Sequence, residues 1–196
     1  MNHYIVLDLE TQKAFSEVRK GKTHELKVSV VGIYDSADNE YVCYEESEIP
    51  KLEQRLKNVD YLIGFNIRHF DMPVLQPYLL SSITAFPLLD LMEEVEKVRG
   101  HRVSLHSIAQ ATFGRGKIGH SEDAIQLFRQ GRMEELKRYC LEDVRLTKEI
   151  YDFGKQEGKI LFQSHKDWKV HEVPVEWGKQ TFQVQQPNNA FPTSLF

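Results

Sequence analysis

The stretch HYIVLDLET, residues 3–11, decides the fold of this chain. Residues 3–9 form a nearly continuous apolar run, which is typical of a strand in the middle of a sheet that is covered on both faces. Side chains two residues apart in a strand point to the same face, so Asp8 and Glu10 project together from the end of this strand. The sequence therefore predicts a buried central strand that ends in two carboxylates.

The segments around this strand predict an α/β sheet, because strands alternate with helices. A charged stretch, 12–27, reads as a mobile loop, and a hairpin follows at 28–34 and 41–45. Apolar residues at intervals of three and four indicate helices in the rest of the chain. Further strands are expected at 60–64, 86–89, 159–162 and 168–173, and helices at 47–59, from about Phe70, and at 91–98, 105–112, 121–130 and 133–153.

Length and composition favour one folded domain. The chain has 196 residues, 41% of them hydrophobic, and a formal net charge of -4. This is too apolar for a disordered chain, and any polyanion must meet a local basic patch. We expect the domain to span 1–178, followed by a tail at 179–196 whose residues 180–196 carry no charged side chain.

Two cysteines, Cys43 and Cys140, cannot make a disulfide scaffold, and neither lies in a metal-binding pattern. Cys140 reads as a small core residue. The first residues lack the features of a signal peptide, and the longest uncharged stretch, 72–89, contains three prolines. A cytoplasmic protein without a membrane partner is expected.

Three acidic motifs follow one another along the chain. They are Asp8-Leu-Glu10, Asn66-Ile-Arg-His-Phe70-Asp71 and Tyr139-Cys-Leu-Glu-Asp143. The first and third spacings also occur elsewhere in the chain, so the middle motif is the most specific.

On a helix, Tyr139 and Asp143 lie one turn apart, on the same stripe as Leu146 and Ile150. A carboxylate on a core-facing stripe is costly unless it is paired, and an ion pair with a nearby Arg is the alternative to a metal site for Asp143.

Carboxylates that converge need a cation. Two unit charges about 4 Å apart repel each other by roughly 4 kcal/mol at an effective dielectric of about 20. If Asp8, Glu10, Asp71 and Asp143 meet, hard divalent cations with oxygen ligands remove this repulsion. The absence of a His or Cys cluster in the sequence favours Mg²⁺ or Mn²⁺ over Zn²⁺. A pair of such ions is a known device for attack on a phosphodiester, so we predict two divalent cations, Mg²⁺ or Mn²⁺, as cofactors.

The ordered motifs resemble those of the DnaQ-like DEDD 3′-5′ exonucleases, in the tyrosine (DEDDy) branch. The resemblance covers about residues 3–150, and Arg138 stands where the histidine branch has its His. Within that superfamily, the segments ETQKAF (10–15) and LEDVRLTKEIYDFG (141–154) are most similar to YprB-type ribonuclease-H-like domains. The resemblance implies a ribonuclease H-like α/β fold, in which a five-stranded mixed sheet with one antiparallel strand is flanked by helices.

The resemblance also implies roles for the acidic motifs, position by position. Asp8 would bridge both ions, and Glu10 and Asp143 would complete the site of the ion that bears the nucleophile. Asp71 would hold the second ion through water. Tyr139 would orient the attacking water.

Four residues are expected to contact the substrate. The resemblance implies that Asn66 and Phe70 shape the pocket for the terminal nucleotide, and Thr11 is grouped with them. Residues 97–138 contain nine Lys or Arg against four acids, so a phosphate backbone could follow this segment. Lys117 is the preferred phosphate contact, and the alternative for the whole segment is a set of solvated helix faces.

Glycines at 114, 116 and 119 match the dinucleotide-binding fingerprint. The residues before them read as a helix and not as a strand, so the phosphate-cradling geometry is missing. No nucleotide cofactor is expected.

These features predict a hydrolase, namely a metal-dependent 3′-5′ exonuclease that acts on single-stranded ends by a two-metal mechanism. DNA is expected to be slightly preferred over RNA, although no motif encodes contacts to the 2′-hydroxyl. Two alternatives stay open: a structure-selective ribonuclease-H-like endonuclease, and a catalytically inactive module that binds nucleic acid or protein. The last residues, TSLF (193–196), are similar to the end of bacterial sliding-clamp-binding peptides, which implies a replication or repair partner; a dangling hydrophobic tail is the alternative.

Overall fold

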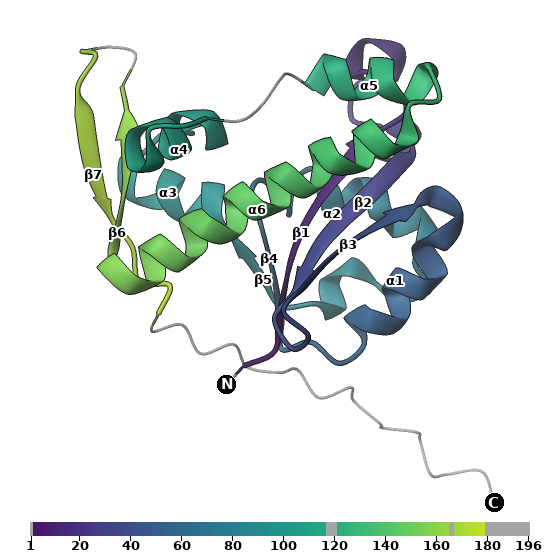
Figure 1. Ribbon diagram of the computed structural model, residues 1–196, viewed down its shortest axis with the longest axis horizontal. Coiled ribbons are helices and arrows are strands. Elements are labelled where there is room, and N and C mark those ends of the chain that lie inside the picture. Colours follow the sequence, from purple (N-terminus) through teal and green to yellow (C-terminus); the bar gives the residue numbers. More distant parts are fainter. Residues whose placement is uncertain (1, 117–120, 165–166, 179–196) are drawn as a thin grey trace, which may run out of the picture.

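The computed structural model describes residues 2–116, 121–164 and 167–178 (Figure 1). Within these ranges, five strands form one mixed sheet in the order β3-β2-β1-β4-β5. Strand β2 runs antiparallel to β1 and β3, while β4 and β5 continue the sheet parallel to β1. The strands are β1 (Tyr4–Thr11), β2 (Val28–Asp35), β3 (Glu40–Glu45), β4 (Tyr61–Gly64) and β5 (Leu88–Asp90). The expected ribonuclease H-like sheet with one antiparallel strand is confirmed.

Helices cover both faces of this sheet. One face packs against α3, α4, α6 and the antiparallel pair β6–β7, and the other face packs against α1 and α2. In Figure 1, α6 runs across the strands from α5 to the β6–β7 pair. These elements are α1 (Ile49–Leu56), α2 (Asp71–Leu75), α3 (Leu91–Arg99), α4 (Leu105–Phe113), α5 (Ser121–Arg129), α6 (Met133–Glu157), β6 (Lys159–Gln163) and β7 (Val170–Pro174).

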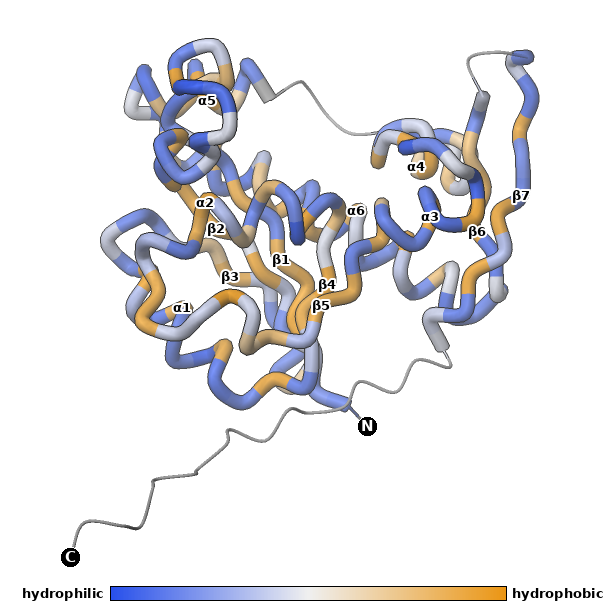
Figure 2. Tube along the Cα trace, turned by 180° about the vertical axis from the view of Figure 1, so that it is seen from behind, coloured by the Kyte–Doolittle hydropathy of each residue, from blue (hydrophilic) through white to orange (hydrophobic). Residues whose placement is uncertain are grey.

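Strand β1 lies at the centre of both cores, which explains its continuous apolar run. Val6 belongs to the core on the α6 side, and Ile5, Leu7 and Leu9 belong to the core on the α1 and α2 side. Figure 2 shows the hydrophobic colour concentrated along the central strands. Since successive side chains alternate, the residues that follow Val6 on its face are the carboxylates of the first acidic motif. Asp8 and Glu10 therefore place negative charge on the α6 face of the sheet, where β1 ends.

The close approach of α6 to the sheet depends on a glycine in β2. Gly32 is the register partner of Asp8. A Cβ atom at Gly32 would lie 2.9 Å from Sγ of Cys140 and 3.0 Å from Cγ2 of Val144, both on α6. Glycine therefore leaves room for the helix to pack directly against the strand that carries Asp8.

Three elements differ from their sequence-based expectations. The stretch 12–27 contains two short 3-10 helices, Phe15–Glu17 and Thr23–Leu26, and Leu26 is buried against α2 and the sheet. Helix α1 is shorter than the expected 47–59. Helix α6 runs past the expected end at 153, and Gly154 is part of it. A Cβ atom at Gly154 would lie 2.4 Å from the ring of Trp177, so glycine leaves room for this ring to pack against the helix.

Other sequence-based expectations fall outside this description. Lys117 and the proposed tail, 179–196, both lie outside the described residues. No helix among the described residues combines the length and the apolar character needed to span a bilayer.

We expect Gly32→Ala to lower the free energy of unfolding by about 1–3 kcal/mol, because the new methyl group would push α6 away from β2. Urea unfolding followed by circular dichroism measures this loss. Ser29→Ala in the same strand is the matched control: Oγ of Ser29 is buried and has no hydrogen-bond partner among the described residues, so its removal should change stability little. A Gly32→Ala variant as stable as the parent would contradict this account of the α6 packing.

Candidate active site

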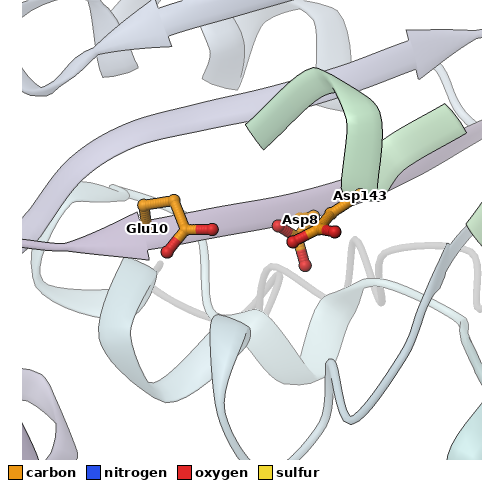
Figure 3. A group of neighbouring side chains, drawn as sticks. All are labelled: Asp8, Glu10 and Asp143. Atoms are coloured by element: carbon orange, nitrogen blue, oxygen red, sulfur yellow. The ribbon is translucent and has the colours of Figure 1, made fainter. Parts of the chain in front are cut away.

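Three carboxylates meet where α6 crosses β1. Asp8 and Glu10 project from β1, and Asp143 reaches them from α6 (Figure 3). One oxygen of each carboxylate can be chosen so that all three lie within 4.8 Å of one another. Glu10 and Asp143 are buried, and Asp8 is half-buried. Hard oxygen donors at this spacing fit a divalent cation such as Mg²⁺ or Mn²⁺.

Cys140 lies in the interface that brings Asp143 to β1. Its Sγ is 3.5 Å from the backbone oxygen of Asp8 and 4.0 Å from Oδ2 of the same residue. A hydrogen bond with Cys43, burial and the negative charge of Asp8 raise the pKa of the Cys140 thiol well above its ordinary value. The thiol therefore stays protonated, as expected of a small core residue.

Asp71 joins the same end of β1 from another direction. It is the first residue of α2, is only 2% exposed, and accepts a hydrogen bond of 3.1 Å at Oδ1 from the backbone N–H of Leu9. Leu9 lies between Asp8 and Glu10, so the carboxylate of Asp71 is attached to the strand that carries the first motif. Asp71 stands outside the group of three, and its expected place at a second cation stays a prediction.

Asp90 organises the turn of the middle motif, a role that the sequence analysis missed. Its Oδ1 accepts from the backbone N–H of Asn66 at 2.9 Å and from that of Met92 at 3.1 Å, and its Oδ2 accepts from Arg68 N–H at 3.1 Å. Asn66 has a left-handed backbone with a φ of 67°, so the turn is fixed by contacts from outside it. An Asp that ends a strand and caps the following helix was the available signal.

A cavity of about 700 Å³ opens beside these carboxylates. Asp8, Glu10 and Asp71 line it. Three of the four residues expected to contact the substrate, Thr11, Asn66 and Phe70, line it as well. The fourth is Lys117, which lies outside the described residues. Their contacts with a substrate stay a prediction.

Phe15 is a cavity residue that the sequence analysis missed. It comes from the segment read as a loop, its ring centroid lies 5.7 Å from that of Phe70, and it remains 65% exposed. An aromatic side chain this exposed at the mouth of a cavity offers a stacking surface to a ligand. The charged residues around Phe15 hid this signal in the sequence.

Tyr139 lies one helical turn before Asp143, as its spacing indicates. Its hydroxyl is buried, and its ring packs against the small cluster of Val30, Leu136 and Cys140. Among the described residues that line the cavity, neither Tyr139 nor Asp143 appears. The expected role of the Tyr139 hydroxyl in orienting water stays a prediction.

Much of the basic segment 97–138 is neutralised by ion pairs. Six of its nine basic residues bond to carboxylates: Lys97 to Glu94, Arg102 to Glu96, Arg115 to Glu149, Arg129 to Glu17, Arg132 to Glu135, and Lys137 to Glu45 and Glu134. These pairs favour solvated helix faces over a continuous phosphate track.

The comparisons with known proteins agree with this fold. The model of the RNase H superfamily matches residues 5–153, and the chain belongs to this superfamily. Among solved structures, the fold is similar to that of the family B DNA polymerase from the hyperthermophilic archaeon Pyrobaculum calidifontis, with a TM-score of 0.61 and 16% sequence identity over 79% of this chain. This chain spans 24% of the polymerase chain. The comparison with curated proteins finds no match.

We expect Asp90→Asn to lower the free energy of unfolding by about 1–3 kcal/mol, because an amide replaces a carboxylate that accepts several backbone N–H groups. Chemical denaturation measures the change. Asp152→Asn, which removes an exposed carboxylate paired with Lys148 on α6, should change stability by no more than about 1 kcal/mol. Equal effects of the two substitutions would refute the role given to Asp90.

Proposed function

We propose that this protein is a metal-dependent 3′-5′ exonuclease that hydrolyses phosphodiester bonds at single-stranded nucleic-acid ends, with DNA slightly preferred over RNA. The observation that carries this proposal is the group formed by Asp8, Glu10 and Asp143 within 4.8 Å, of which Asp8 and Glu10 line a nucleotide-sized cavity. The resemblance of the three motifs to the DEDDy exonucleases and the membership in the RNase H superfamily support it.

The carboxylates would hold two divalent cations. Asp8, Glu10 and Asp143 would bind one, and Asp8 and Asp71 would hold the other. The bound cations would supply the positive charge that activates water and stabilises the leaving oxygen. Tyr139, one turn from Asp143 on α6, would orient the attacking water.

The cavity residues would bind the terminal nucleotide. The rings of Phe15 and Phe70 would stack with the terminal base. Oδ1 of Asn66 is buried and has no hydrogen-bond partner among the described residues, so it can accept a hydrogen bond from the nucleotide. The two rings, whose centroids lie 5.7 Å apart, would place the base beside the carboxylates.

A ribonuclease-H-like endonuclease is the second candidate, and superfamily membership favours it. It needs no free end, whereas an exonuclease must begin at one. Circular single strands therefore separate the two proposals.

With Mg²⁺ or Mn²⁺, we expect the parent protein to shorten 5′-labelled linear strands stepwise from the 3′ end and to leave circular strands intact. Asp8→Asn should lower the rate by about a hundredfold or more, because it removes a carboxylate of the central group. Gel analysis of the products measures both results, and matched DNA and RNA strands report the preference.

Asp38→Asn is the control for this experiment. Asp38 and Glu40 repeat the Asp-x-Glu spacing in the β2–β3 turn, where Asp38 is ion-paired with Arg55. Its substitution should leave the rate unchanged. Cleavage of circles at the linear rate would overturn the exonuclease proposal in favour of the endonuclease, and inactivity with both metals would overturn both.

A further inference from the structure

A second cavity, of about 510 Å³, adjoins the first. The two share Arg102, Val103 and Ser104, which connect α3 to α4. Beyond these shared residues, the second cavity is lined by Arg99 and His101 on one side and by residues of the β6–β7 pair on the other. Figure 2 shows the β6–β7 pair standing beside α3 and α4. The second cavity, called the groove below, therefore extends from the residues that it shares with the first cavity to β6 and β7.

We propose that this groove binds the single strand on the 5′ side of the terminal nucleotide. The inference rests on the proposed function, because the position of the groove beside the first cavity is what identifies its occupant. A strand whose 3′ end lies beside Asp8 must leave the first cavity, and the groove lies next to it beyond Arg102.

Arg99 supplies the charge that a phosphate would meet. Its guanidinium lies over the ring of Phe162, with Cζ 4.9 Å from the ring centroid. Its Nε is buried without a hydrogen-bond acceptor in the described part of the chain. In those residues Arg99 also forms no ion pair, whereas Arg102 bonds to Glu96 at 3.2 Å. A cation that is held in place by an aromatic ring and is not neutralised suits a phosphate.

The floor of the groove is aromatic and fixed. Phe162 is 2% exposed, His171 stacks on it with ring centroids 5.4 Å apart, and exposed His101 meets it edge-on at 6.2 Å. The flat rings of the two histidines give bases a surface for stacking that does not depend on sequence.

Hydrogen bonds attach the β6–β7 pair to α4. Oγ of Ser107 donates to the backbone oxygen of Gln163 at 2.8 Å, and Oγ1 of Thr112 donates to that of Leu161 at 3.3 Å. These bonds hold β6 against α4, whose Ser107 also lines the groove. A preformed groove binds a flexible strand at a lower entropic cost.

The acid in the groove is already engaged. Asp167 bonds to Nε2 of His171 at 3.0 Å and accepts from the backbone N–H of Lys169. The hydrogen bonds from Lys169 and His171 lower the pKa of Asp167 to about 2. The carboxylate of Asp167 is thus occupied by its own hydrogen bonds, and Arg99 is left as the groove's cation without an ion pair among the described residues.

The test measures binding without metal, by fluorescence anisotropy of a 5′-labelled strand of about 12 nucleotides, a length within the roughly 4–16 nucleotides that single-strand grooves cover. Arg99→Gln should weaken binding by about fivefold or more, and should reduce the slope of log affinity against log salt by about 0.7, the value of one phosphate contact. His101→Ala, at an exposed loop position, should weaken binding through lost stacking even if Arg99→Gln loosens the fold. Lys51→Gln on α1, which faces the opposite side of the sheet, is the charge-matched control and should bind as the parent does.

Two outcomes would overturn the groove: a parent protein that does not bind the strand, or Arg99→Gln and His101→Ala variants that bind it as the control does. Cleavage with metal is measured separately on the same strand. If the parent protein cleaves the strand and the variants bind it as the parent does, the groove proposal is wrong and the exonuclease proposal remains. If the variants bind the strand more weakly and the parent protein does not cleave it, the groove proposal remains and the exonuclease proposal is wrong.

Discussion

The packing of α6 against β1 and β2 is the contact on which the site depends. Gly32 leaves room for Cys140 and Val144, and this close approach brings Asp143 to the carboxylates of β1. The fold thus forces negative charges together at a place where water is largely excluded. Such an arrangement is unfavourable by several kcal/mol unless cations share the space. The apolar cores on both faces of the sheet stabilise the helix against this repulsion.

Backbone hydrogen bonds position the second half of the site. Asp71 accepts from Leu9, and Asp90 accepts from Asn66 and Arg68, so two buried carboxylates tie the middle motif to β1 and β5. The hydrogen bonds from these N–H groups to the two carboxylates are charge-assisted, and such bonds are among the stronger hydrogen bonds in proteins. The cavity is consequently built at the end of β1 and from the turns that follow β4 and β5. Residues 13–16 of the stretch between β1 and β2, the connection from α3 to α4, and α5 complete its walls.

The sequence predicted most of the fold because its periodicity is clear. The apolar run in β1 and the spacing of Leu146 and Ile150 in α6 each follow from burial, and the structure shows both elements. The order and spacing of the acidic motifs also indicated that Asp8, Glu10 and Asp143 converge. What the sequence could not show depends on contacts between distant segments. Asp90 bonds to residues more than twenty positions earlier, and the charged context of Phe15 conceals an aromatic side chain at the mouth of the cavity.

The distribution of charge also depends on contacts between distant segments. The excess of basic residues at 97–138 is visible in the sequence, but the structure shows that most of these residues form ion pairs with carboxylates. Only the three-dimensional arrangement reveals that Arg99 lies over Phe162, in a groove that adjoins the first cavity. Local composition thus predicted a basic surface, and the fold decides which residue of that surface can meet a phosphate.

The central claim is that Asp8, Glu10 and Asp143 form a site for a divalent cation. The most direct test is the stability of the parent protein and of Asp143→Asn as Mn²⁺ is added, measured by chemical denaturation. At a Mn²⁺ concentration of about 100 times the dissociation constant, the parent should gain about 2.7 kcal/mol, while Asp143→Asn should gain far less at the same concentration. A parent protein that does not respond to Mn²⁺ or Mg²⁺, or an Asp143→Asn variant that responds equally, would contradict the account.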